Sequence, residues 1–170
     1  GIESTIVDFS ERIPMVLRPG YITPGMIKDV IGEIEMDPGL VEENSNIHPK
    51  APGMKYKHYA PRAELILVNG AQERVQQTIN DLTREAVESG KAAGVIGTDE
   101  SCKGYQYGVV KSIGTRSDED TIARHLYGIL REFDEQNVDI IYSESFSTPR
   151  IGQAIMNRML KAAGHQVIEV

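Results

Sequence analysis

The strongest constraint on the fold is a regular alternation of strand-like and helix-like segments from residue 64 to the end of the chain. Short apolar runs occur at residues 65–68, 92–96, 107–110, 138–142 and 166–170. Longer segments with apolar residues three or four positions apart separate most of these runs, which is typical of amphipathic helices. Strands that alternate with helices of this length indicate a mostly parallel sheet with helices on both faces. We therefore predict an α/β, Rossmann-like domain over residues 63–170.

Three helices are predicted in this domain, each by one apolar face. The faces comprise Val75, Ile79, Leu82 and Ala86; then Ile122, Leu126, Ile129, Leu130 and Phe133; and finally Ile151, Ile155, Met159 and Ala162. Ser117 and Asp120 form a capping-box-like pair at the start of the second helix. Gly164 follows the third helix and is predicted to end it, as glycine commonly does.

Residues 1–36 do not have the pattern of a complete domain. Their strand-like and helix-like segments are short and occur at residues 5–9, 15–18, 23–31 and 33–35. Thr23 followed by Pro24 predicts the start of the one helix. So few elements cannot bury a core of their own. We expect this piece to be the tail of a larger domain, and residues 37–62 to be a linker.

Charge and composition exclude several classes of protein. The net charge of −7 argues against a broad nucleic-acid face, because duplex binding depends on neutralising phosphates, so we expect no direct, stable nucleic-acid binding. No apolar run approaches the length of about 20 residues that crosses a bilayer, and we expect no signal peptide. The single cysteine, Cys102, excludes an internal disulfide and fits a reducing cytoplasm.

A cationic connector rich in tyrosine, PGMKYKHYAP, spans residues 52–61. Pro and Gly at this density exclude a helix interior or a central strand. Residues 48–62 carry four cationic side chains and no acidic one. Tyr56 or Tyr59 could stack on a base or hydrogen-bond a phosphate while the lysines supply positive charge. The alternative is a solvated linker whose two tyrosines pack on a domain surface.

Ser4, Thr5 and Arg18 lie at the ends of two predicted strands that follow one another in the chain. Hydroxyls and an arginine in such positions can bind a carboxylate and a phosphate, because a guanidinium matches both anions with two parallel hydrogen bonds. The alternative is that Ser4 and Thr5 only favour a strand, and that Arg18 covers a sheet edge.

Other polar residues give weaker signals. The four histidines, none of which shares metal-ligand spacing with another, are His48, His58, His125 and His165. Since Cys102 has no partner either, we expect no metal site. The loops that follow the strands of residues 63–170 lie where doubly wound folds bind ligands. Glu144 and Arg150 are the polar candidates there, with structural capping as the alternative role.

Four segments together resemble the long form of the threonylcarbamoyl-AMP synthase family, which joins a YrdC-like catalytic domain, a linker and a C-terminal Rossmann-like domain. The segments are GIESTIVD at residues 1–8, LRPG at 17–20, the connector at 52–61, and AIMNR at 154–158 with KAA at 161–163. They occur in the family's order over the whole chain, and the connector is the most specific. The resemblance implies that residues 1–36 are a remnant of the α+β catalytic domain.

The resemblance also implies an activity. The family's nucleotidyltransferases make threonylcarbamoyl-adenylate and pyrophosphate from L-threonine, bicarbonate and ATP, with Mg²⁺ accompanying ATP and no permanently bound cofactor. The product serves threonylcarbamoyladenosine modification of tRNA in the cytoplasm. By the same resemblance, Ser4 hydrogen-bonds L-threonine, Arg18 pairs with an ATP phosphate and Tyr59 closes over the nucleotide. The catalytic residues stay unknown, because the family's Lys- and Arg-bearing nucleotide site and its Ser-Asn element have no counterpart here.

We therefore expect the chain by itself to be inactive, with the missing N-terminal catalytic domain as its main partner. Two further hypotheses stay open for residues 63–170: a non-catalytic regulatory or ligand-binding module that controls the lid of a partner domain, and an oligomerisation domain. With strand edges and apolar surface exposed, residues 1–36 should be poorly ordered or should pair with another chain by strand addition.

Overall fold

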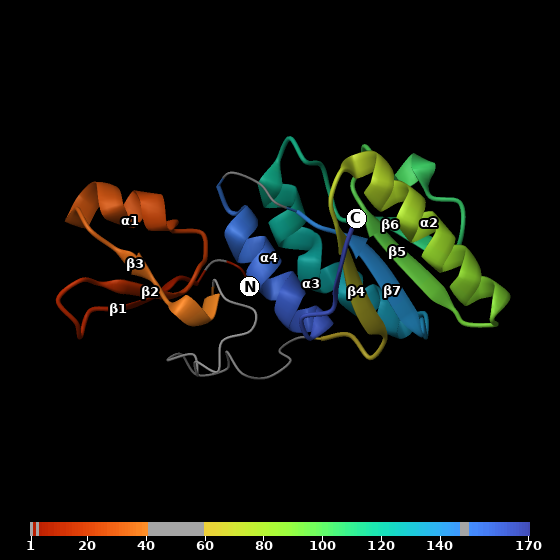
Figure 1. The fold of residues 1–170 in the computed structure, drawn as a ribbon, viewed down its shortest axis with the longest axis horizontal. Helices are drawn as coiled ribbons and strands as arrows, with labels where there is room; N and C mark the ends of the chain where they lie inside the picture. Colours follow the sequence, from red (N-terminus) through yellow and green to blue (C-terminus); the bar gives the residue numbers. More distant parts are fainter. Residues whose placement is uncertain (1, 3, 41–59, 147–149) are drawn as a thin grey trace.

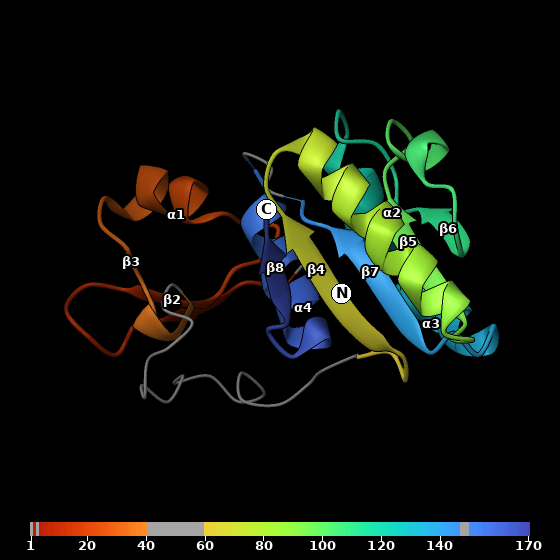
Figure 2. The same ribbon diagram turned by 45° about the vertical axis from the view of Figure 1, so that its right-hand side comes forward.

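The computed structural model describes residues 2, 4–40, 60–146 and 150–170, which form two separate sheets (Figure 1). A sheet of three strands lies in the N-terminal part of the chain, and a sheet of five strands forms the centre of the larger, C-terminal domain. Helix α4 (Gly152–Ala163) lies between the two sheets in both views (Figures 1 and 2). Arg158 of this helix lies 3.5 Å from the carbonyl oxygen of Ser4, so α4 is one place where the two parts of the chain meet.

The larger sheet has the strand order β6-β5-β7-β4-β8, and every neighbouring pair in it is parallel. Its strands are β4 (Glu64–Asn69), β5 (Ala93–Gly97), β6 (Val109–Ser112), β7 (Ile140–Glu144) and β8 (Val167–Glu169). The predicted α/β class with a mostly parallel sheet is confirmed. Strand β6 begins two residues later than predicted, because Gly108 turns the chain with a φ of 73° just before it.

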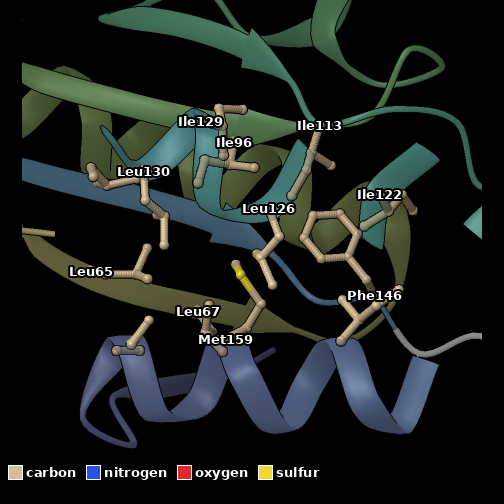
Figure 3. Close-up of a cluster of buried hydrophobic side chains, with 14 of the residues drawn as sticks. Leu65, Leu67, Ile96, Ile113, Ile122, Leu126, Ile129, Leu130, Phe146 and Met159 are labelled. Atoms are coloured by element: carbon tan, nitrogen blue, oxygen red, sulfur yellow. The ribbon is translucent and has the colours of Figure 1, made fainter. Parts of the chain in front are cut away.

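Three helices cover the two faces of this sheet. Helix α2 (Gln72–Glu88) packs on one face, and α3 (Glu119–Glu135) packs with α4 on the other. A short 3-10 helix, η2 (Cys102–Gly104), follows β5. Figure 3 shows Met159 of α4 among the side chains of α3 and the strands, in the larger of the two cores. Every residue of the three predicted apolar faces is buried except Leu82, which is partly buried.

The ends of two helices test the predicted caps. Helix α3 is capped by Asp118, whose carboxylate accepts from the backbone N–H of Asp120 at 3.1 Å. The prediction of Ser117 as the cap is wrong: its hydroxyl lies 2.9 Å from that of Thr115 instead. A carboxylate is the stronger partner at the positive end of a helix. Gly164 ends α4 in the left-handed conformation, with a φ of 61°, as predicted.

The smaller sheet has three short strands, two of which are connected by one helix. Its strands are β1 (Ile6–Asp8), β2 (Met15–Arg18) and β3 (Glu35–Met36), with β1 antiparallel and β3 parallel to the central β2. Helix α1 (Pro24–Ile31) connects β2 to β3, and the short 3-10 helix η1 (Pro38–Leu40) follows. The predicted cap of α1 is confirmed, since the Thr23 hydroxyl accepts from Met26 N–H at 3.2 Å.

This N-terminal piece buries little apolar surface. Leu17 is the one buried residue of its hydrophobic cluster, α1 buries no residue, and Val30 is 84% exposed. The one hydrophobic cluster of this piece among the described residues is small, which fits the prediction that so few elements bury little core of their own. Of the two alternatives predicted for this piece, poor order does not hold for the described residues, because main-chain pairing of three strands and a capped helix gives them regular structure. Pairing with another chain by strand addition stays a prediction.

Candidate functional site

The antiparallel pairing of β1 and β2 brings Ser4 next to Gly20. Ile6 is the partner of Arg18 in this register, so the residues two positions beyond each, Ser4 and Gly20, face one another. A Cβ placed on Gly20 would lie 2.5 Å from the carbonyl carbon of Ser4 and 2.6 Å from its carbonyl oxygen. The backbone of Ser4 therefore packs directly on Gly20, at a distance that no other residue type permits.

Thr5 fixes the same segment from another direction. Its hydroxyl donates to the carbonyl oxygen of Ile22 at 2.8 Å, across 17 positions of the chain. This bond ties the segment that enters β1 to the segment that leaves β2. Ser4 is left exposed at this corner, and Arg18 is half-buried at the end of β2. The structure thus places the predicted substrate residues Ser4 and Arg18 at the same end of one strand pair.

Helix α4 adds two cations to this corner. Arg158 and Lys161 are three positions apart and therefore share one face of the helix. Arg158 is 6% exposed; its Nη2 lies 3.5 Å from the carbonyl oxygen of Ser4, and its Nη1 donates to Asn157 Oδ1 at 2.9 Å. Lys161 is 9% exposed and lies close enough to Arg158 and Arg18 for both to lower its pKa. We call Arg18, Arg158 and Lys161 the cationic corner.

Ile2 anchors the start of the chain in the larger domain. Its side chain is 3% exposed and belongs to the hydrophobic core that α3 and α4 form with the sheet. Burying a side chain of this size contributes roughly 1.5–3 kcal/mol. Because Ser4 follows two residues later, the core of the larger domain helps to hold Ser4 in place.

The cationic corner makes stability depend on pH. Burial, followed by repulsion from Arg158 and Arg18, lowers the pKa of Lys161 from 10.5 to about 8. Between these two values the unfolded chain binds more protons than the folded chain, so the free energy of unfolding rises with pH. Below the lower value both states are protonated, and the whole penalty for burying the charge is present.

We therefore expect the wild-type chain to gain about 1–3 kcal/mol of stability relative to the variant Lys161→Met as the pH rises from about 7 to about 10.5. The comparison with the variant removes the contribution of every other titrating group. Urea denaturation of both proteins at the two pH values measures the gain. A difference between them that stays constant with pH would contradict it.

A second polar cluster lies at the carboxyl ends of the strands of the larger sheet, around Glu144. This carboxylate is fully buried, accepts from the Tyr105 hydroxyl at 2.5 Å and pairs with Arg116. Burial, and then the bond to Glu144, raises the pKa of Tyr105. Burial, and then the charge of Glu144, raises the pKa of the Cys102 thiol. Since both carboxylate oxygens are bonded by neighbouring side chains, we interpret the cluster as a structural brace.

Arg150, the other residue predicted at this end of the sheet, pairs with a different carboxylate. Its Nε lies 3.9 Å from Oε1 of Glu119, which also accepts from the backbone N–H of Arg150 at 3.3 Å. The second oxygen of Glu119 accepts from Ile151 N–H at 2.6 Å. Glu119 thus connects the first turn of α3 to the start of α4. The structure therefore fits the capping alternative for Arg150 and adds Glu119, which the sequence did not single out.

Several predicted residues lie outside the described part of the chain, or carry no ligand geometry within it. Tyr56, Tyr59, His48 and His58 lie outside the residues that the structure describes. His125 has its Nδ1 3.0 Å from the carbonyl oxygen of Ile113, which is a structural contact. Among the described residues, no three or more His, Cys, Asp and Glu side chains are grouped as metal ligands. Nor does any helix in those ranges have the length and hydropathy to cross a membrane.

Comparison with known families gives a match over most of the chain. Residues 22–164 match the family model described as threonylcarbamoyl-AMP synthase, C-terminal domain. Over 99% of its length the chain is 46% identical to the threonylcarbamoyl-AMP synthase of Bacillus subtilis, of which it covers 47%. The chain thus spans about half the length of the curated relatives it matches.

Two solved structures are similar to the whole chain. The crystal structure of Sua5 from P. abyssi in complex with L-threonine matches with a TM-score of 0.85 and 38% identity, over 100% of this chain and 48% of that one. A P. abyssi Sua5 variant, in which a histidine and the tyrosine that follows it are both replaced by alanine, matches with a TM-score of 0.86 and 38% identity, over 100% of this chain and 47% of that one. Both matches therefore include the smaller sheet as well as the larger domain.

Proposed function

The chain belongs to the threonylcarbamoyl-AMP synthase family, and from this premise we propose that it is the C-terminal part of an enzyme that makes threonylcarbamoyl-AMP. The substrates are L-threonine, bicarbonate and ATP, the last with Mg²⁺, and the second product is pyrophosphate. The nucleotide product serves threonylcarbamoyladenosine modification of tRNA in the cytoplasm. The half of the relatives that this chain does not cover corresponds to the domain that supplies the remaining catalytic groups.

In the proposed reaction the amine nitrogen of L-threonine combines with bicarbonate to give a carbamate and water. A carbamate oxygen then attacks the α-phosphorus of ATP. The bond from this phosphorus to the oxygen that bridges it to the β-phosphorus breaks, and pyrophosphate leaves with that oxygen and its electron pair. The protein contributes mainly the positioning of the reactants and the stabilisation of the negative charge that develops.

Three residues of the chain have proposed roles: Ser4 hydrogen-bonds L-threonine, Arg18 binds an ATP phosphate and Tyr59 closes over the nucleotide. The observation that carries the proposal is the register of β1 and β2, which sets Ser4 at the end of the strand pair that also presents Arg18. The role of Tyr59 has independent support. A His–Tyr pair occurs once in this sequence, at His58 and Tyr59, and an adjacent His–Tyr pair is what one of the matched Sua5 variants replaces.

A second role is proposed for the larger domain, as a module that holds the substrate-binding segment in place. Ile2 is inserted into its core, and Arg158 of α4 contacts the Ser4 backbone. Ile2 lies two residues before Ser4, and Arg158 contacts Ser4 itself. This role complements the enzymatic one, because a segment held on both sides has less freedom to lose when substrate binds.

The full-length protein with Ser4→Ala tests the proposal. We expect its KM for L-threonine to rise about tenfold, because a hydrogen bond to a charged group contributes roughly 1.5 kcal/mol. The KM for ATP should change little, and the variant Ser10→Ala, in the exposed turn after β1, serves as the control. Pyrophosphate release is measured with L-threonine, bicarbonate and ATP omitted in turn. Turnover without L-threonine would refute the function, and an unchanged KM would refute the role of Ser4.

A further inference from the structure

The last residues of the connector are fixed on helix α3. Pro61 is buried, and a cavity of about 120 Å³ is lined by Ala60, Pro61 and side chains of α3 that include Tyr127 and Leu130. The backbone N–H of Arg62, the next residue, donates to Oδ1 of Asp134 at 2.7 Å, across 72 positions of the chain. The end of the connector is therefore attached to the last turn of α3.

The fold of the larger domain does not depend on this attachment. Strand β4 begins at Glu64, whose N–H already donates to the carbonyl oxygen of Asp139 at 3.0 Å, and Ala63 is buried in the core. Arg62 is exposed, so water would bond its N–H if the Asp134 carboxylate were absent. The bond therefore adds little to the stability of the domain, but it fixes the chain just before β4.

Proline strengthens this restriction. The ring of Pro61 limits its own φ to about −65°, and it also restricts the backbone of Ala60 before it. With the N–H of Arg62 bonded as well, three successive residues have little conformational freedom. Tyr59 directly precedes them in the sequence. A fixed neighbour leaves fewer conformations to be lost when such a residue binds a ligand.

Helix α3 also contacts the segment that leads to Ser4. Ile2 lines a cavity of about 340 Å³ together with residues of the first half of α3, among them Asp120. Asp120, Tyr127, Arg131 and Asp134 are separated by seven, four and three positions, so they share one face of the helix. One face of α3 thus lies against the start of the chain and against the end of the connector.

We propose that Asp134 is a positioning residue for the nucleotide: by holding Arg62 it fixes the end of the connector and so directs Tyr59 towards ATP. This inference rests on the proposed function, in which Tyr59 closes over the nucleotide, and adds a residue to it. Asp134 acts through Tyr59 and is not itself expected to contact a substrate. Helix α3 then serves both substrates, L-threonine through Ile2 and ATP through Asp134.

Three variants of the full-length protein test the inference. We expect Asp134→Ala to raise the KM for ATP about tenfold, because about one more residue has to be ordered whenever the nucleotide binds. The KM for L-threonine should stay within about twofold. Asp134→Asn keeps an acceptor oxygen and should restore the wild-type KM. Glu135→Ala, which removes an exposed carboxylate from the next position of α3, is the matched control. Melting temperatures are measured for all of them.

A double-mutant cycle with Tyr59→Ala separates positioning from a general structural role. If Asp134 acts through Tyr59, then adding Asp134→Ala to Tyr59→Ala should change the KM for ATP less than about twofold. Three outcomes would overturn the inference: a wild-type KM for ATP in Asp134→Ala, the full tenfold effect in the Tyr59→Ala background as well, or an equal defect in Asp134→Asn.

A failure of the proposed function looks different in the same experiments. A wild-type KM for ATP in Tyr59→Ala alone would refute the role of Tyr59, whatever the Asp134 variants do. No pyrophosphate release by the wild-type protein would refute the function as a whole. Either result would also remove the basis of the inference.

Discussion

Replacing Arg18 by alanine in the full-length protein is expected to lower the turnover about 100- to 1,000-fold, with the affinity for L-threonine within about twofold of the wild type. Arg18 is the candidate phosphate ligand, and its Nε is buried without a partner among the described residues. A guanidinium that stabilises phosphate charge in the transition state contributes more to the rate than to the binding of the other substrate. Steady-state pyrophosphate release with saturating L-threonine measures the turnover.

A second variant of Arg18 separates the effect of its paired hydrogen bonds from that of its charge, and a variant of Arg12 serves as the control. Arg18→Lys keeps the charge but loses the paired hydrogen bonds, so we expect it to recover only part of the turnover. Arg12→Ala removes an exposed arginine from the turn between β1 and β2 of the same sheet and should behave as the wild type. If Arg18→Ala kept its turnover, or lost L-threonine and ATP binding equally, the assignment of Arg18 to phosphate would be wrong.

Gly20→Ala is expected to lower the affinity for L-threonine about tenfold or more, although the new side chain is a single methyl group. That methyl would lie 2.5 Å from the Ser4 carbonyl carbon and 2.6 Å from the Thr5 Oγ1, so the segment around Ser4 has to move. The same movement would disturb the contact between Ser4 and Arg158. A displacement of about 1 Å at a substrate-positioning residue is enough for a loss of this size.

The control for this prediction is Gly25→Ala, the same chemical change in the first turn of α1. Its Cβ would meet only the Thr23 Oγ1, at the ordinary contact distance of 3.7 Å. We expect this variant to bind L-threonine normally and to be slightly more stable, because alanine favours a helix over glycine. Calorimetry with L-threonine and circular dichroism of both variants give the comparison. Normal L-threonine affinity in Gly20→Ala would show that the Ser4 segment does not need its observed position.

The sequence predicted the larger domain well because its signal is periodic. The apolar faces of α2, α3 and α4 repeat at helical spacing, and burial follows that spacing. The ends of the helices and strands were predicted less accurately, because each end depends on a few single residues. Strand β3 was expected at residues 33–35 but lies at Glu35–Met36, where it pairs with β2 across the α1 connection. Such a pairing joins residues that are distant in the sequence, and no local pattern specifies it.

The candidate site was predicted in part, for the same reason. Ser4 and Arg18 could be singled out because each lies at the end of a recognisable strand. Arg158 and Lys161 entered only as part of a family resemblance, because charged residues on a helix are ordinarily exposed. The signal that could have found them is their place beside Met159 and Ala162, in a helix that is buried on almost every side. On that side Arg158 reaches the carbonyl oxygen of Ser4 in the N-terminal piece, a contact that the periodicity of α4 alone cannot reveal.

The insertion of Ile2 means that the border between the two parts of the protein does not fall at the linker. The side chain of Ile2 lies in the core of the larger, C-terminal domain, although Ile2 comes before the strands of the smaller sheet in the chain. Chimeras of two relatives that are joined at residue 63 should therefore fail to fold, unless residue 2 comes from the same relative as helices α3 and α4. Substitutions that repack α3 and α4 for higher stability would, through Ile2, also shift the position of Ser4.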